Sequence, residues 1–232
     1  MKKMAKKNTA SNVVRYEDLI EVDPITENQE KAYSAWDDGN NLVLSGCAGT
    51  GKTFLAMALA LEDVLDPDTD YDSLVVIRSI VSTRDPGHLP GSKDEKESAF
   101  HGPYRAICSE LFEDPNSFRK LMSTGVLQFE STSFIRGMTW NNAIIIVDEM
   151  QNLNFHELDS VITRVGKDAK IIFCGDYKQS DFRHSDDKDG IHKFLDIISH
   201  MNNFETINFH WEDIVRSGMV RDYLMTKEML GY

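Results

Sequence analysis

Apolar positions along the chain follow two patterns. Short apolar runs predict strands, and apolar residues at helical spacing predict helices between them. The expected strands cover residues 42–44, 74–77, 126–129, 143–147, 170–174 and 204–209. The expected helices cover residues 26–36, 52–65, 104–111, 117–122, 155–165 and 191–200, with a last helical region up to the end. Because several strand runs are apolar at consecutive positions, both faces of the sheet should be covered. The pattern predicts an α/β fold of three layers around a mostly parallel sheet.

The chain divides into an expected arm and one domain. Residues 1–25 carry several lysines near the start and are expected to form a flexible basic arm, which Pro24 closes. Residues 26–232 are expected to form a single domain. The polar stretch 81–101 is long for a connection inside a compact domain, and loops of that length are usually functional.

Composition narrows the protein class. The chain has 232 residues, of which 41% are hydrophobic, and these values fit an ordinary globular protein. Its apolar runs are far shorter than the roughly 20 residues that cross a bilayer, so no membrane association is expected. Three widely spaced cysteines suit a reducing compartment, hence a cytoplasmic protein. The net charge of −13 argues against a broadly basic groove for nucleic acid.

A phosphate-binding motif follows the first expected strand. Its residues are Gly46-Cys47-Ala48-Gly49-Thr50-Gly51-Lys52-Thr53, which match G-x-x-x-x-G-K-[ST] between a strand and a helix. Glycines let backbone N–H groups point at phosphate oxygens, and the helix start adds a positive dipole end. Lys52 is expected to neutralise the β- and γ-phosphates, and the Thr53 hydroxyl to bind Mg²⁺. The motif predicts a nucleoside triphosphate as the ligand.

Two acids follow the most apolar strand. Asp148 and Glu149 come directly after residues 143–147, where uncompensated charges would be costly. We expect Asp148 to hold the Mg²⁺ shell and Glu149 to accept a proton from an attacking water. A base aimed at water favours hydrolysis over transfer to a small acceptor. After the strand at 170–174, Gln179 could sense the γ-phosphate and orient water while Asp176 fixes the loop, but taken alone these residues favour a simple Gly-Asp turn.

Five motifs, in order and spacing, resemble the PhoH family of P-loop ATPases, which are similar to the first RecA-like domain of superfamily 1 helicases. They lie at residues 89–96, 133–140, 146–152, 175–181 and 213–216, and the resemblance spans about residues 26–226. The family is common in bacteria and in tailed phages, and a compact phage version would suit this chain. Several positions depart from the family pattern: Cys47, Ser79, Met138, Met150 and Ser217. At position 138 a second basic residue is usual, so its loss weakens the case for nucleic-acid contact there.

The resemblance implies roles for further residues. The implied nucleotide-binding set is Gln29, Gly46, Cys47, Ala48, Gly49, Thr50, Gly51, Lys52, Thr53 and Phe54. Gln29 matches a glutamine that reads adenine, although Thr26 and Gln29 could instead form a capping box. Arg216 matches a late arginine that could act as a finger on the γ-phosphate, and the alternative is a surface pair with Glu212.

Size and resemblance together suggest an assembly. Superfamily 1 helicases enclose ATP between two RecA-like domains, and this chain has room for one. We therefore expect a homo-oligomeric ring, such as a hexamer, in which Arg216 or another arginine completes a neighbouring site. The expected function is Mg²⁺-dependent ATP hydrolysis coupled to single-stranded RNA or DNA. The alternatives are a slowly hydrolysing switch that binds a protein partner and a P-loop kinase.

Overall fold

A six-stranded parallel sheet forms the centre of the molecule. The structure, a computed structural model, describes residues 13–79, 101–133, 135–176 and 185–231. The strands lie in the order β3-β2-β4-β5-β1-β6, and each pair of neighbours is parallel. Their bounds are β1 (Asn41–Gly46), β2 (Ser73–Arg78), β3 (Leu127–Ser131), β4 (Ala143–Val147), β5 (Lys170–Gly175) and β6 (Phe204–Phe209). The expected α/β class and parallel sheet are confirmed.

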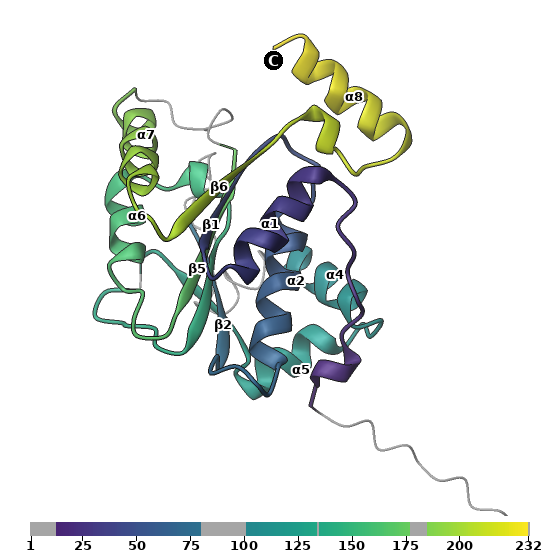
Figure 1. Ribbon diagram of the computed structural model, residues 1–232, viewed down its shortest axis with the longest axis vertical. Coiled ribbons are helices and arrows are strands. Elements are labelled where there is room, and N and C mark those ends of the chain that lie inside the picture. The colour runs from purple at the N-terminus through teal and green to yellow at the C-terminus, as the bar shows by residue number, and fades with distance from the viewer. Residues whose placement is uncertain (1–12, 80–100, 134, 177–184, 232) are drawn as a thin grey trace, which may run out of the picture.

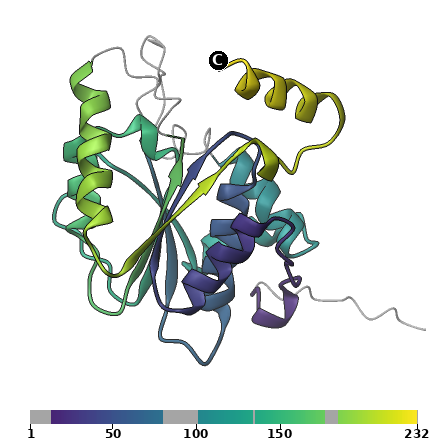
Figure 2. The ribbon, with the colours of Figure 1, turned by 45° about the horizontal axis from the view of Figure 1, so that its top comes forward.

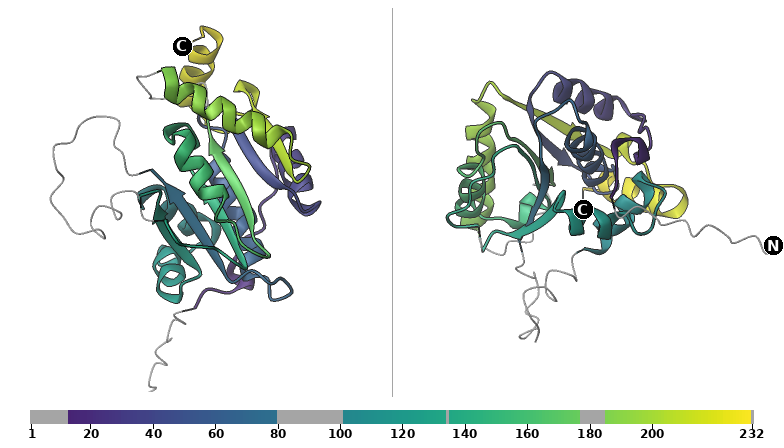
Figure 3. Two further views of the ribbon diagram at one scale, coloured as in Figure 1. Left: turned by 90° about the vertical axis from the view of Figure 1, so that its left-hand side faces the viewer. Right: turned by 90° about the horizontal axis from the view of Figure 1, so that it is seen from below.

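Helices cover both faces of this sheet. Figure 1 shows α1 (Glu27–Asp37), α2 (Lys52–Leu65), α4 (Gly102–Leu111) and α5 (Ser117–Thr124) on one side. On the other side lie α6 (Phe155–Ile162) and α7 (Ser185–Ser199), which pack side by side in the left view of Figure 3. Short 3₁₀ turns lie at η1 (Tyr16–Asp18), η2 (Met150–Asn152) and η4 (Trp211–Asp213). Three layers result, as the apolar strand pattern predicts.

Consecutive apolar residues of each central strand serve the two faces in turn. In β4, Ile144 and Ile146 pack into the core beneath α2, whereas Ile145 and Val147 pack into the core beneath α6 and α7. All four side chains are fully buried. Successive strand residues point to opposite faces, so a strand covered on both sides needs an unbroken apolar run. This is why the strands show no apolar–polar alternation in the sequence.

The last helix extends away from the three layers. Helix α8 (Gly218–Met229) follows η4 and projects past the carboxyl end of the sheet, as Figure 2 shows. Its side chains Met219, Val220 and Tyr223 are 83%, 52% and 67% exposed. Among the described helices, none is long and apolar enough to cross a membrane.

Two expectations about boundaries need correction. Residues 13–25 are not a free arm, because Val14, Leu19 and Val22 pack against the core and Ile20 N donates to Leu111 O at 2.9 Å. The domain therefore begins before residue 26, while residues 1–12 lie outside the described part of the chain. Helix α7 begins at Ser185 rather than near residue 191. Its first residues are polar, so apolar spacing alone misses a helix start that Ser and Asp favour.

Strand order brings distant motifs to one edge. The carboxyl ends of β2, β4, β5 and β1 are neighbours, because these four strands are adjacent in the sheet. Arg78, Asp148, Asp176 and the loop after β1 consequently meet at the edge where parallel sheets bind ligands.

Candidate functional site

The loop after β1 has the geometry of a phosphate cradle. Gly49 and Gly51 have φ values of 80° and 81°, which L side chains rarely adopt. Gly51 is the N-cap of α2, so the free N–H groups of the first turn of α2 face the loop. This 14-residue helix also contributes its positive dipole end there.

Gly46 is required by a close approach of two strands. A Cβ atom at this position would lie 1.9 Å from the carbonyl oxygen of Phe209, and its φ is 125°. The adjacent Cys47 N donates to that same oxygen at 3.2 Å. The start of the loop is thus fixed against β6 by backbone alone, which positions every residue that follows.

Lys52 is folded onto its own loop. Its Nζ donates to the carbonyl oxygens of Gly46 and Cys47, each at 2.7 Å, and lies 3.4 Å from Thr50 Oγ1. Burial lowers the pKa of Lys52, and the nearby Cys174 and Asp176 act in the opposite direction. The ammonium group is therefore held by loop oxygens that a phosphate could replace.

The motif threonine contacts the strand acid. Thr53 Oγ1 donates to Asp148 Oδ1 at 3.0 Å, although 95 residues separate the two in sequence. Asp148 is only 5% exposed. Its other oxygen, Oδ2, accepts from the Tyr104 hydroxyl at 2.6 Å. Burial, and then the Asp148 carboxylate, raise the pKa of Tyr104, so this hydroxyl keeps its proton as a donor.

Glu149 is held in an unusual backbone conformation. Its φ and ψ are 53° and 45°, the left-handed region that non-glycine residues rarely occupy. Gln151 Nε2 donates to Glu149 Oε2, and Gln151 Oε1 accepts from Asp176 N at 3.0 Å. Arg78 Nη2 lies 3.9 Å from Glu149 Oε1. One amide side chain therefore ties the carboxylate after β4 to the backbone after β5.

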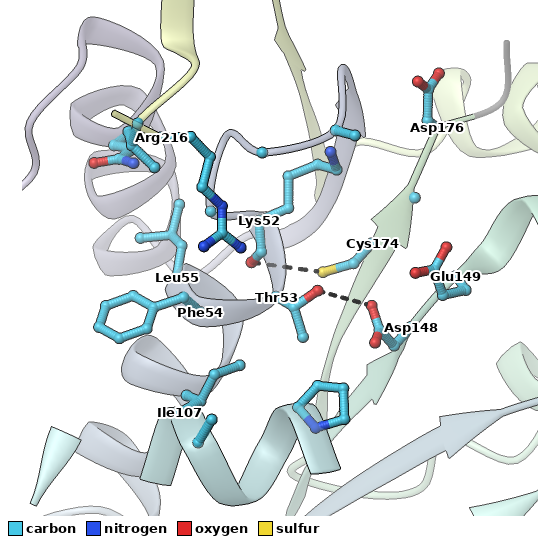
Figure 4. A pocket seen from close by; sticks show the side chains of 18 of the residues that line it. Lys52, Thr53, Phe54, Leu55, Ile107, Asp148, Glu149, Cys174, Asp176 and Arg216 are labelled. Atoms are coloured by element: carbon cyan, nitrogen blue, oxygen red, sulfur yellow. Dashed lines mark hydrogen bonds between the residues drawn. The ribbon is translucent and has the colours of Figure 1, made fainter. Parts of the chain in front are cut away.

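Arg216 lies in the pocket of its own chain. Asp213 Oδ2 accepts from His210 N and from Asn28 Nδ2, both at 2.8 Å, which fixes the turn after β6. Val215 N then donates to Gly49 O at 3.1 Å. From this loop Arg216 is directed into the pocket, as Figure 4 shows. Within the described residues it forms no ion pair with Glu212 or another carboxylate.

Gln29 lines the pocket and also takes part in the cap of α1. Its backbone N donates to Thr26 Oγ1 at 3.3 Å, which is half of a capping box. Its side-chain Oε1, however, accepts from Ile25 N at 2.9 Å rather than from the backbone of Thr26. Gln29 Nε2 is 3.4 Å from Thr50 O, so the amide links α1 to the phosphate loop. The predicted capping box is therefore only half formed.

These groups line one pocket of about 870 Å³. Most of the predicted site residues line it: Gln29, Ala48, Gly49, Gly51, Lys52, Thr53, Phe54, Asp148, Glu149 and Arg216. Gly46, Cys47 and Thr50 are not among the lining residues. Cys47 and Thr50 are buried, and the Thr50 hydroxyl donates to Cys47 O at 3.0 Å. Gln179 lies outside the described residues. The pocket is also lined by the apolar and aromatic side chains Val22, Ile25, Tyr33 and Ile107.

The residues present fit a hard divalent cation that takes one or two ligands from the protein and the rest from phosphates and water. Thr53 Oγ1 and Asp148 Oδ1 are oxygens that face the loop, and oxygen is the ligand that Mg²⁺ prefers. In the described part of the chain, no three His, Cys, Asp or Glu side chains group into a protein-only metal site. Mg²⁺ is usually bound through one or two protein oxygens plus phosphates and waters, so this small donor set is compatible with it.

Two functional candidates escaped the sequence analysis. Tyr104 lies on α4, outside every motif, and nothing in its sequence surroundings distinguishes it from a core tyrosine. Gln151 lies inside the stretch that resembles the PhoH family, two residues after Glu149, which was a usable signal. Arg78 also lines the pocket, where it forms an ion pair with Glu149.

Known proteins that are similar in sequence to this chain are PhoH-like proteins. The PhoH-like protein from Mycobacterium leprae is 32% identical over 203 residues, covering 87% of this chain and 57% of that protein. Protein PhoH2 from Bacillus subtilis is 39% identical over 149 residues, covering 62% of this chain and 34% of that protein. The chain thus spans about half the length of the mycobacterial relative and a third of PhoH2.

Solved structures agree on the fold. The large terminase from a thermophilic bacteriophage superposes with a TM-score of 0.50 at 14% identity, covering 89% of this chain and 50% of that chain. At this identity the likeness concerns the P-loop fold alone. The sequence model of the PhoH-like protein family matches residues 21–227. The chain therefore belongs to the PhoH-like protein family.

Proposed function

We propose that this protein is a Mg²⁺-dependent ATPase that releases inorganic phosphate. The observation that carries the proposal is the hydrogen bond between Thr53 and Asp148 at 3.0 Å. It joins the end of the phosphate loop to the acidic end of β4. Phosphate-loop proteins use this pair of groups to hold a nucleotide-bound cation.

Each side chain has a distinct part in the proposed reaction. Lys52 exchanges its carbonyl partners for phosphate oxygens, and the N–H groups at the start of α2 bind the same oxygens. Thr53 and Asp148 would hold Mg²⁺, which when bound would neutralise phosphate charge. Glu149 accepts a proton from the attacking water, the bond to the γ-phosphorus forms, and the bond to the β,γ-bridging oxygen breaks. ADP and inorganic phosphate are the products.

Arg216 supplies the remaining positive charge. Since its side chain lines the same pocket as Lys52, it can act on the γ-phosphate of an ATP molecule bound to its own chain. This differs from the expected supply by a neighbouring copy. An arginine that contacts the transition state contributes about 10³–10⁵ in rate.

We further propose that the protein works on single-stranded RNA or DNA as a homo-oligomer. Helix α8 supports association, because Met219, Val220 and Tyr223 lie on one side of it and leave 83%, 52% and 67% of their surfaces exposed. A second copy is the proposed partner for this face. Stimulation of hydrolysis by single-stranded RNA, weakening as salt rises, would support the nucleic-acid role, because phosphate contacts release counterions. If the protein is instead a nucleotide-dependent switch that binds a protein partner, it should hydrolyse ATP slowly both with and without nucleic acid.

The decisive experiment follows ATP binding and phosphate release together. Lys52→Ala should abolish tight ATP binding, whereas Glu149→Gln should retain binding and lose about 10²-fold or more in turnover. Lys31→Ala, which removes an exposed lysine paired with Glu27, is the matched control and should behave as wild type. Transfer of phosphate to an added small acceptor would identify a kinase instead. No ATP binding by the wild-type protein would overturn the proposal.

A further inference from the structure

Both carboxylate oxygens of Asp148 are occupied by neutral hydroxyl donors. Thr53 Oγ1 bonds Oδ1 at 3.0 Å from the pocket side, and Tyr104 OH bonds Oδ2 at 2.6 Å from the core side. Tyr104 is fully buried, whereas Thr53 lines the pocket. The two bonds therefore have different environments, and only one of them can be exchanged for a ligand in the pocket.

We propose that Tyr104 is a positioning residue that orients the Asp148 carboxylate toward the cation of a bound nucleotide. This rests on the proposed ATPase function. The terminal torsion of an aspartate is broad, so a carboxylate held at one oxygen can still turn. Fixing Oδ2 from the core leaves Oδ1 facing Thr53 and the loop. Groups that orient a metal ligand in this way typically contribute 10–100-fold in metal affinity or activity.

Packing in the core holds the Tyr104 ring, and with it the hydroxyl, in one position. Its ring packs edge-on against Phe129, with centroids 5.0 Å apart at 62°. Phe129 in turn contacts Phe118 and His101, so the ring is held from β3, α5 and the start of α4. A hydroxyl on a rigid buried ring cannot follow the carboxylate, and the carboxylate must therefore adopt the orientation that the ring dictates.

Helix placement connects this hydroxyl to the rest of the site. Tyr104 lies in the first turn of α4, and Pro103 beside it lines the pocket. Arg78, at the end of β2, is close enough to Tyr104 to act on its hydroxyl and also reaches Glu149. Asp148 is therefore contacted by Tyr104 from α4, and Glu149 by Arg78 from β2.

A purely structural role makes a different prediction. A buried phenol needs an acceptor, and Asp148 could serve only to satisfy it. Removing the hydroxyl would then lower stability without changing how the site responds to Mg²⁺. If the hydroxyl orients the carboxylate, the response to Mg²⁺ changes while nucleotide binding without Mg²⁺ does not.

Tyr104→Phe separates these roles, because it removes one oxygen from a ring surrounded by aromatic side chains. Tyr71→Phe is the matched control: this tyrosine packs against the same core near the start of β2, at the opposite edge of the sheet. Binding of a fluorescent non-hydrolysable ATP analogue is titrated with Mg²⁺ in each protein. We expect the Mg²⁺ concentration for half-maximal enhancement to rise about 10-fold in Tyr104→Phe. Tyr71→Phe should match wild type.

Analogue binding without Mg²⁺ shows in the same samples that the site is folded, and it should change less than twofold. A second measurement repeats Tyr104→Phe in an Asp148→Asn background and follows thermal unfolding of the Mg²⁺-free proteins. If Tyr104 acts through Asp148, the loss of stability in the double variant should differ from the sum of the losses in the Tyr104→Phe and Asp148→Asn single variants. An unchanged Mg²⁺ titration in Tyr104→Phe, or additive effects, would overturn the inference. Failure of wild type to bind the analogue would overturn the ATPase proposal itself.

Discussion

The backbone amide of Val215 donates to the carbonyl oxygen of Gly49 at 3.1 Å, so the chain after β6 is attached to the phosphate loop. A Cβ atom placed on Gly49 would lie 3.2 Å from Arg216 Cγ and 2.8 Å from Leu224 Cδ1. The arginine and the first turns of α8 thus rest directly on the loop. This attachment is what brings Arg216 into its own pocket.

Arg216→Ala should lower turnover at least 10²-fold while ATP binding falls only a few-fold, because the guanidinium acts mainly on the transition state. Arg119→Ala, which removes an exposed arginine of α5, is the control. Steady-state phosphate release measures both. Mixing Arg216→Ala with Lys52→Ala should restore no activity if the arginine serves its own chain. Recovery in the mixture would show that it serves a neighbour.

Gln151→Glu should reduce turnover by about 10²-fold, because it replaces the donor to Glu149 with a second negative charge and misplaces the carboxylate. The variant keeps an oxygen that can accept from Asp176 N, so the link to β5 can persist. Gln128→Glu makes the same change of charge at an exposed position of β3 and should leave turnover unchanged. Turnover of Gln151→Glu equal to wild type would exclude Gln151 from the site.

Gly46→Ala should destabilise the fold by about 3 kcal/mol or more, because the new Cβ would overlap Phe209 O and the φ of 125° disfavours any side chain. Gly39→Ala is the matched control, since Gly39 has a φ of 86° and open space around it. That substitution should cost only about 1–2 kcal/mol from backbone strain. Urea unfolding of both variants compares the two. Equal losses would mean that β1 and β6 can separate without penalty.

Glu62→Gln should stabilise the protein at neutral pH. Burial, followed by repulsion from Asp63, Asp37, Asp66 and Glu21, raises the pKa of Glu62 above its usual value. A carboxylate with a raised pKa destabilises the folded state above that pKa, and its effect disappears below the unfolded value of 4.5. Because the side chain is only partly buried and water screens the repulsion, the gain should be small, about 1–2 °C in Tm at pH 7.

The pH dependence of the Tm difference between Glu62→Gln and wild type tests this prediction. Thermal unfolding of Glu62→Gln and wild type should differ at pH 7 and converge as the pH falls below about 4.5. Glu17→Gln changes an exposed acid of η1 outside this group and serves as the control. A gain that persists at pH 3 would attribute the effect to helix propensity at the end of α2 rather than to charge.

Local sequence was sufficient for the elements of the fold. Helix 52–65 and strand 143–147 were predicted with the bounds that the structure has. Their apolar periodicity, and the Gly-Lys-Thr transition between β1 and α2, depend only on neighbouring residues. The candidate loop and the acids Asp148 and Glu149 could be chosen for the same reason. The family resemblance pointed to Gln29 and Arg216, whose partners it could not supply.

Only the tertiary structure decided which distant groups meet. The order β3-β2-β4-β5-β1-β6 places β5 between β1, which leads into the loop before Lys52, and β4, which Asp148 follows. No local pattern encodes that order. The contact of Tyr104 with Asp148, the amide bridge of Gln151 and the attachment of Val215 to Gly49 all follow from it. Periodicity reports which face of an element is apolar. Which surfaces then come together is determined by packing the whole chain, so these partners were beyond sequence reasoning.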